Sequence, residues 1–145
     1  MAWEEWSEYE RGYVAAFIDG EGSICITKSA DGYYRAVCAL YNTHLPTMNF
    51  LSDLIGEECL TRSVDKRRRV LQTKDNYAIY IRRKLKLLDF LNFILPYLVT
   101  KVEQCKLTIK FLETVLNREE SKYSEEDKIK MEQFYIQNSK LNKGD

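Results

Sequence analysis

The sequence lacks any long hydrophobic run. No window approaches the roughly 18 uncharged apolar residues that a membrane-spanning helix needs. The first ten residues, MAWEEWSEYE, are acidic and contain no apolar stretch, so a signal peptide is not expected. These two absences favour an intracellular protein with no membrane partner.

The sequence is also poor in metal-binding side chains of the zinc type. It has a single histidine, His44, and its four cysteines never occur at Cys-x-x-Cys spacing, which argues against a zinc site. Cys25 and Cys38 lie in apolar runs, where a cysteine usually acts as a small buried hydrophobe. Cysteines of this kind suit a reducing compartment.

What the chain does contain is enough apolar material for one domain. Its 145 residues are 45% hydrophobic and 30% charged, which is the composition of a globular protein with its own core. We therefore expect a single domain over residues 1–145.

Charge is unevenly distributed along the chain. The net charge is zero, yet residues 61–86 contain ten basic and two acidic residues, so this segment carries +8 and the remainder −8. A basic segment hidden in a neutral chain is typical of a surface that binds nucleic acid. A solvated charged hairpin would give the same composition, so the charge alone leaves both interpretations open.

The stretch YVAAFIDGEGSI, residues 13–24, combines features that a core helix does not need. Small and apolar residues lead into two acids, Asp19 and Glu21, which are interleaved with Gly20 and Gly22. The dipole at the C-terminal end of a helix is negative, so carboxylates there require a positive partner. A divalent cation with oxygen ligands is one such partner. For Asp19, a capping or hydrogen-bonding role is the alternative.

Hydrophobic periodicity and turn residues predict the order of elements. Asp31-Gly32 predicts a two-residue hairpin turn, and Thr43 or His44 is expected to cap the second helix. The turn between the third and fourth strands falls either near residues 65–66 or near 74–76. We predict helices at 7–19, 45–56, 85–95, 99–116 and from 124, with strands at 23–29, 33–41, 59–64 and 77–83.

The order αββαββα with two C-terminal helices predicts an α+β fold. Its expected form is a four-stranded antiparallel sheet with helices packed on one face. The other sheet face is then free to bind a ligand, and it would present many of the bases of the second hairpin, because strand residues alternate between faces.

This order, together with the opening stretch, resembles the LAGLIDADG homing endonucleases. The nine-residue motif corresponds to residues 14–22, VAAFIDGEG, with valine in place of the leading leucine and Ala16 at the usual glycine position. The later stretches ALYNT, LIG and LPYLVTKVEQCKL also resemble landmarks of the family. The resemblance implies a LAGLIDADG core at 7–117, a helical extension at 118–138 and a tail at 139–145 that frays.

The resemblance also implies a metal-dependent active site. Glu21 matches the metal-binding acid of the family, and the carbonyl of Gly20 matches a backbone ligand. The implied ion is Mg²⁺, with Mn²⁺ or Ca²⁺ able to substitute for binding. Lys101 matches the basic residue near the scissile phosphate. Asn42 is the candidate for ordering water, although an Asn-Thr pair at that place would equally serve as a helix cap.

A single copy of the motif implies a homodimer, because one catalytic acid cannot cut two strands. Small residues on the first helix would let two such helices approach closely. The expected interface residues are Tyr13, Ala15, Ala16 and Asp19, and two-fold symmetry predicts a nearly palindromic target.

Double-stranded DNA is the expected partner of the open sheet face. The residues proposed to contact it are Lys28, Tyr33, Arg35, Arg62, Lys66, Arg68, Gln72 and Lys74, with Tyr34 as a further candidate. Arg67 and Arg69 have the opposite strand parity from Arg68. Arg82 and Arg83 lie nearer the end of the sheet and are expected to touch phosphate or solvent.

The implied function is that of a homing endonuclease that makes a staggered double-strand break in a long DNA site by phosphodiester hydrolysis. The alternative is a protein of the same fold that does not cleave DNA, either a maturase that binds intron RNA or a DNA-binding regulator. The implied location is the cytoplasm or nucleoid of a prokaryote, or an organelle.

Overall fold

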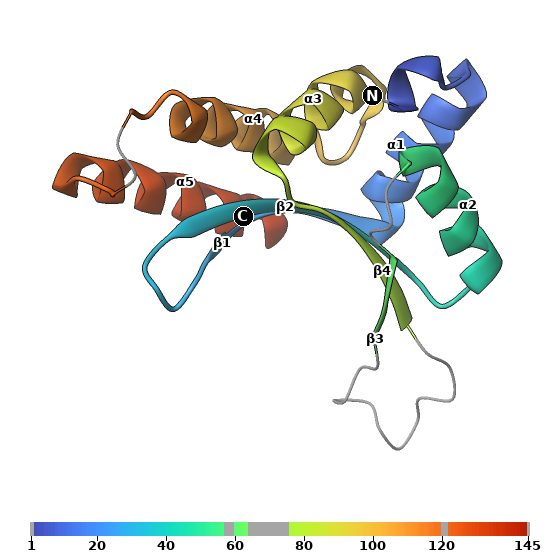
Figure 1. Ribbon diagram of the computed structural model, residues 1–145, viewed down its shortest axis with the longest axis horizontal. Helices are drawn as coiled ribbons and strands as arrows, with labels where there is room; N and C mark the ends of the chain where they lie inside the picture. The colour runs from blue at the N-terminus through green and yellow to red at the C-terminus, as the bar shows by residue number, and fades with distance from the viewer. Residues whose placement is uncertain (1, 57–59, 64–75, 120–121, 145) are drawn as a thin grey trace.

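The computed structural model describes residues 2–56, 60–63, 76–119 and 122–144, with the backbone alone for 60–63. It confirms the predicted α+β fold (Figure 1). The elements are η1 (Ala2–Glu5), α1 (Glu8–Glu21), β1 (Gly22–Lys28), β2 (Tyr34–Asn42), α2 (Leu45–Ile55), β3 (Leu60–Ser63), β4 (Asn76–Ile81), α3 (Lys84–Ile94), η3 (Leu95–Tyr97), α4 (Val102–Leu116) and α5 (Glu125–Asn142).

The strands form an antiparallel sheet in the order β1-β2-β4-β3. Figure 1 shows this sheet as an arch, with α1 to α4 on its convex side and α5 along the outer strand β1. The concave side carries no helix of the described chain. The arrangement therefore leaves one curved sheet face open.

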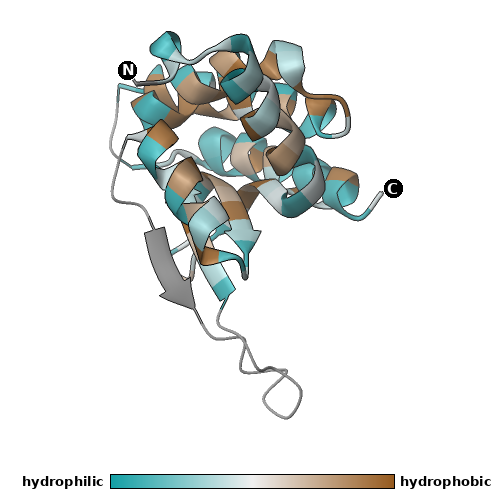
Figure 2. Ribbon diagram, turned by 90° about the vertical axis from the view of Figure 1, so that its right-hand side faces the viewer, coloured by the Kyte–Doolittle hydropathy of each residue, from teal (hydrophilic) through white to brown (hydrophobic). Residues whose placement is uncertain are grey.

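The core lies between the sheet and the helices. Along β1, Ile24 and Ile26 are buried while the residues between and beyond them are more exposed, as expected for a strand with one covered face. Hydrophobic segments gather where the helices meet the sheet (Figure 2). Trp3, from η1, is fully buried and donates a hydrogen bond to Asp89 on α3, so the N-terminal segment belongs to this core.

Helix α1 starts within one residue of the predicted position but ends two residues later than predicted. Ser7 caps its start in a capping box with Glu10. At the other end the helix continues through Gly20 to Glu21, and the chain turns at Gly22. A Cβ on Gly22 would lie 2.8 Å from the carbonyl oxygen of Ala39, so close approach of β2 requires glycine there.

The first hairpin has a longer turn than predicted. Ser29 and Tyr33 are joined by a backbone hydrogen bond of 2.9 Å, so the connection contains Ala30, Asp31 and Gly32. Gly32 has φ of 84° and supplies the left-handed position of this three-residue turn. The prediction of a two-residue turn was wrong, although the glycine that defines the turn was correctly located.

Helix α4 begins at Val102 rather than at residue 99. The backbone N–H groups of Val99 and Lys101 donate hydrogen bonds to the carboxylate of Asp19, which holds this segment outside the helix. Apolar periodicity cannot reveal such a contact, because its acceptor lies about 80 residues away in the sequence.

The C-terminal tail does not fray where the sequence suggested. Helix α5 continues to Asn142, since Asn138 and Asn142 bind the backbone of β1. The side chain of Asn138 accepts a hydrogen bond from Ile26 N–H at 2.9 Å and donates one to the carbonyl of Ile24 at 3.2 Å. The amide thus pairs with the outer edge of β1 as a neighbouring strand would, and it blocks pairing with another chain.

Replacing Asn138 with leucine should lower the stability of the fold. Asn138 is 2% exposed, and its loss leaves the N–H of Ile26 without this acceptor, whereas the carbonyl of Ile24 keeps its hydrogen bond from Asn142. We therefore expect a cost of about 1–3 kcal/mol. Urea unfolding followed by circular dichroism measures the change. Gln137→Leu, on an exposed position of the same helix, is the matched control and should change the midpoint little. Equal midpoints for Asn138→Leu and the wild type would contradict this role.

None of the helices in the described part of the chain is long and apolar enough to cross a bilayer. The prediction that cysteines act as buried hydrophobes is confirmed for Cys38, whose burial raises its thiol pKa, whereas Cys25 is only half-buried. Cys105 is also buried, which raises its pKa to about 12.

Candidate active site and nucleic-acid interface

The motif places its two acids in different environments. Glu21, the last residue of α1, is exposed, as is Gly20 before it. Asp19 is half-buried and bonded to the loop before α4. The last carbonyls of a helix have no partner within the helix, so Gly20 can offer its carbonyl oxygen next to an exposed carboxylate. The sequence interpretation of the two acids as unequal agrees with this placement.

Asp19 and Lys101 cap each other's helices. The carboxylate of Asp19 accepts hydrogen bonds from Val99 N–H at 2.8 Å and from Lys101 N–H at 3.0 Å, just before α4. In return, the Nζ of Lys101 donates to the carbonyl of Asp19 at 2.6 Å, in the last turn of α1. No side chain of α4 caps its own N-terminus, so the cap comes from the motif helix.

Each charge in this exchange lies where a helix dipole favours it. The anionic Asp19 faces the positive N-terminal end of α4, and the cationic Lys101 faces the negative C-terminal end of α1. The N-terminal end of α4 thus supplies the positive partner that a carboxylate near the C-terminal end of α1 requires. The exchange also fixes the ammonium of Lys101 on the turn that carries Gly20 and Glu21.

Arg11, on α1, holds residues 93–97, which lead to the loop before α4, against its own helix. Its guanidinium lies 4.0 Å from the ring centre of Phe93 and 4.1 Å from that of Tyr97, and it donates a hydrogen bond to the carbonyl of Phe93. The hydroxyl of Tyr97 donates to Glu8 at 2.6 Å. The chain that leads to Lys101 is therefore fastened to α1 at both ends of the helix.

Asn42 takes part in the turn before α2. Its side-chain oxygen accepts a hydrogen bond from His44 N–H at 2.8 Å, and His44 caps the helix through Thr47 N–H at 3.3 Å. The capping alternative for Asn42 is therefore realised in the structure, while its role in ordering water stays a prediction. Of the two expected cap residues, His44 is the one used.

Within the described residues, no three His, Cys, Asp or Glu side chains gather into a metal site. Glu21 is the one acid that the motif leaves exposed at the end of α1. Mg²⁺ commonly binds through one or two carboxylates and completes its coordination with water and substrate phosphates. An exposed carboxylate beside an available carbonyl fits such an ion only as part of a larger set of ligands.

The exposed face of α1 is made of small and aromatic residues. Gly12, Ala16 and Gly20 follow one another at intervals of four, which places them on one face. A Cβ on Gly12 or Gly20 would meet nothing within 4 Å, so the described fold does not itself require glycine at either position. Tyr13 flanks this face and packs edge-on against Phe50 of α2, with 5.5 Å between ring centres.

Ala15 does not belong to this face. It is fully buried in the core, so the prediction that it lies at a dimer interface was wrong, because a helix turns by about 100° per residue and Ala16 faces outward instead. Asp19 is likewise occupied by residues 99–101 of its own chain. Tyr13 and Ala16 are the predicted interface residues that remain available.

The concave sheet face carries a mixed set of side chains. Strand alternation and register place on it Ser23, Cys25, Thr27, Arg35, Val37, Tyr41 and Tyr80. Arg35 is held in position by Asp31, to which it makes an ion pair of 3.2 Å. The Ser29 hydroxyl, the Tyr33 N–H and the Arg35 guanidinium all donate hydrogen bonds to this carboxylate and lower the pKa of Asp31 to about 2.

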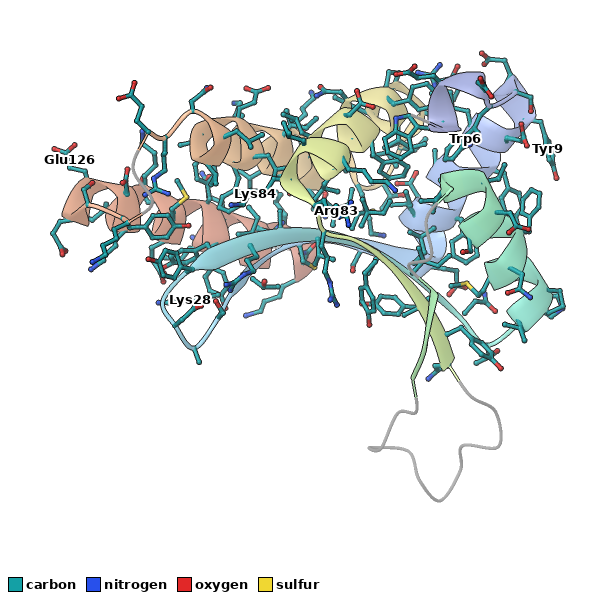
Figure 3. All side chains as sticks on the ribbon, viewed as in Figure 1. Trp6, Tyr9, Lys28, Arg83, Lys84 and Glu126 are labelled. Carbon is teal, nitrogen blue, oxygen red and sulfur yellow. The ribbon has the colours of Figure 1, made fainter. Side chains whose placement is uncertain are left out.

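Lys28 lies on the opposite face from the one predicted. It has the same parity as Ile24 and Ile26, and its Nζ makes an ion pair of 3.1 Å with Glu132 on α5. The hydroxyl of Tyr34, which is buried, binds the same carboxylate, and both contacts lower the pKa of Glu132. The structure therefore does not place Lys28 and Tyr34 on the concave face, because both side chains bind Glu132 of α5. Figure 3 shows Lys28 in the first hairpin.

The remaining predicted contacts divide into three groups. Tyr33 packs against Tyr123, with 4.8 Å between ring centres. Arg62 lies in β3 opposite Tyr77, and the description there covers the backbone only. Four predicted contacts lie outside the described residues: Lys66, Arg68, Gln72 and Lys74. The turn between β3 and β4, whose position the sequence left open, also lies outside them, except for Asn76, the first residue of β4.

The chain is similar to known proteins in its structure. No protein-family model and no curated protein matches the sequence. Among solved structures, the homing endonuclease I-CvuI in complex with its target in the presence of Ca has 15% identity and a TM-score of 0.71, covering 92% of this chain and 82% of that one. The archaeal intron-encoded homing endonuclease I-Vdi141I, complexed with DNA, has 15% identity and a TM-score of 0.73, covering 92% and 84%.

A third similar structure is the homing endonuclease I-TnaI, with 18% identity and a TM-score of 0.66, covering 92% of this chain and 93% of that one. At these identities, the similarity concerns the fold. The likeness extends over nearly the whole of the chains compared, so it includes the motif helix, the sheet and the C-terminal helices together. The chain therefore has the fold of the LAGLIDADG homing endonucleases.

Proposed function

We propose that the protein is a site-specific DNA endonuclease that acts as a homodimer. The observation that carries this proposal is the end of α1, where Glu21 is exposed while Lys101 is held on the same helical turn. The open concave face of the sheet begins at the next residue, Gly22. A nuclease needs this combination of an acid, a cation and an adjoining binding surface, whereas a protein that only binds needs the surface alone.

The curvature of the sheet suits the major groove of duplex DNA. A two-stranded ribbon fits this groove, and the similar structures I-CvuI and I-Vdi141I are complexes with DNA. From the described strands, Arg35 and Tyr80 on the concave face are the residues we expect at the DNA. Arg62, Lys66, Arg68, Gln72 and Lys74 remain proposed contacts.

Glu21 and the carbonyl of Gly20 would hold Mg²⁺, which supplies an activated water and stabilises the leaving oxygen. The exposed position of Glu21 leaves its carboxylate free to share such an ion with a phosphate or with a second copy of itself. The ammonium of Lys101, fixed by its bond to Asp19, would stabilise the negative charge that develops on the phosphate.

A second copy of the chain completes the site in this proposal. The small-residue face of α1 (Gly12, Ala16 and Gly20) permits close approach of two helices about a two-fold axis. This arrangement would place two Glu21 carboxylates together, which requires cations between them. It would also make the DNA target nearly palindromic.

Cleavage of a random DNA library tests the proposed function. Plasmids that carry a randomised insert are incubated with the protein in Mg²⁺ or in EDTA, and the ends of the linear products are sequenced. We expect one recurring, nearly palindromic site, cut on both strands in Mg²⁺ only. Selective binding of a duplex or an intron RNA without cleavage would contradict the nuclease and favour the regulator or the maturase.

A further inference from the structure

A cavity of about 680 Å³ lies beside β2, at the end of the sheet away from the motif helix. Strand β4 pairs with β2 only from Cys38 to Asn42, so no described strand covers that side of residues 34–37. The cavity is lined along this free stretch by Tyr34, Arg35, Ala36 and Val37. It therefore occupies the space that a longer β4 would fill.

Aromatic and apolar side chains form much of the lining of this cavity, but every charged residue in the lining is basic. These five cations come from three separate parts of the chain: Arg35, Arg82, Arg83, Lys84 and Arg118. Arg118 is held by an ion pair of 3.2 Å with Asp127 and lies 4.2 Å from the ring centre of Tyr123. Arg35 and Arg118 are each paired with a carboxylate, and the further cations of the lining favour an anionic ligand.

The start of α3 adds to this field. Its N-cap residue, Arg83, makes no side-chain cap hydrogen bond, and the first turn contains no acidic residue. The positive end of the helix dipole at this place favours an anion. Figure 3 shows Arg83 and Lys84 where the chain leaves the sheet to begin α3.

The cavity is continuous with the concave sheet face. Thr27, Arg35 and Val37 belong to that face and also line the cavity. Thr27 is five residues along β1 from Gly22, so the cavity lies about 17 Å from the end of the motif helix at 3.3 Å per residue. This corresponds to about five base-pair steps of 3.4 Å measured from the end of the motif helix.

We propose that this cavity is a second DNA-backbone site, in which Arg82 and Lys84 bind phosphates of the flank of the target. The inference rests on the proposed function, since it takes duplex DNA as the ligand. An acidic peptide paired with the free edge of β2 is the competing occupant. Continuity with the concave face favours DNA, because a duplex lying along the sheet passes the mouth of the cavity.

The test uses two exposed residues, so that folding is preserved. Lys84 is exposed at the first position of α3, and Arg82 is exposed and lies 4.3 Å from the ring centre of Tyr80. The double variant Arg82→Ala/Lys84→Ala is compared with Lys110→Ala, which removes an exposed charge from α4 outside the cavity. Lys84→Arg tests whether retaining the charge preserves binding.

Fluorescence anisotropy with a labelled 30-base-pair duplex of arbitrary sequence, at several salt concentrations, gives the number of phosphate contacts. Each lost contact lowers the slope of log affinity against log salt by about 0.9. We expect the double variant to lose a slope of about 1–2 and to bind roughly tenfold more weakly at low salt. Lys110→Ala and Lys84→Arg should resemble the wild type.

A double variant with the wild-type slope would overturn this site while leaving the proposed function intact. Failure of the wild type itself to bind duplex would overturn both. A labelled oligoglutamate peptide serves as the competing ligand. If the wild type bound this peptide and the double variant did not, while both bound the duplex equally, the occupant would be an acidic peptide and not DNA.

Discussion

Glu21→Gln should abolish DNA cleavage while leaving DNA binding nearly intact. The amide keeps the shape of the side chain but removes the charge that would hold Mg²⁺, so we expect a loss in cleavage rate of at least about 10³-fold. Affinity for the duplex should change by less than about threefold, because Glu21 lies at the end of α1 rather than on the concave sheet face. Single-turnover cleavage and anisotropy on the same duplex measure both quantities.

A matched carboxylate provides the control for this variant. Glu113 is an exposed acid on α4, and Glu113→Gln should cleave at the wild-type rate. If Glu21→Gln cleaved as fast as Glu113→Gln, Glu21 would have no part in metal binding. Reduced binding in Glu21→Gln, equal to its reduced cleavage, would instead assign the residue to DNA recognition.

Asp19→Ala should affect both stability and cleavage, because the Asp19 carboxylate caps α4 from another helix. Its removal leaves the N–H groups of Val99 and Lys101 without their acceptor, at a cost of about 2 kcal/mol in the free energy of unfolding. The carbonyl of residue 19 that binds the Nζ of Lys101 remains in this variant, but the backbone that carries Lys101 loses its anchor on α1, so we expect cleavage to fall by about 100-fold. Urea unfolding and single-turnover cleavage of the stable fraction measure the two effects.

Lys101→Met separates the contribution of the Asp19 cap to stability from the contribution of the Lys101 charge to cleavage. This variant keeps the cap that Asp19 provides to α4 but removes the charge from the end of α1, so cleavage should fall while stability falls less than in Asp19→Ala. Asp53→Ala, at an exposed position of α2, is the control for loss of an acid. An Asp19→Ala protein as stable as the control would refute the reciprocal cap.

Local patterns in the sequence were sufficient for most elements of the fold. Ser7 with Glu10 and Ser124 with Asp127 mark helix starts, and Gly56 at φ 77° ends α2, because these residues act on their immediate neighbours. Besides the length of the first hairpin turn, the bounds of α4 and α5 were mispredicted, and there a distant partner decides the outcome. Asp19 shortens α4, and Asn138 extends α5, through hydrogen bonds that periodicity does not encode.

The sequence predicted the residue types of the candidate site better than the faces on which their side chains lie. The motif singled out Glu21, and the later stretch LPYLVTK singled out Lys101. Lys28 was predicted on the DNA face, but its strand parity places it on the face bound by Glu132. Helix phase similarly assigned Ala15 to the surface, although it is buried. The recurrence of Gly12, Ala16 and Gly20 at intervals of four could have revealed the exposed face, because that spacing follows one side of a helix.

The number of chains on one duplex tests the central claim most directly, because each chain carries a single motif and would supply half of the centre. Native mass spectrometry of the protein with its cleaved or bound duplex, in Ca²⁺, gives this number. The account predicts two chains per duplex, a protein mass of twice 17.1 kDa. A stable, cleavage-competent complex with one chain of 17.1 kDa would contradict it.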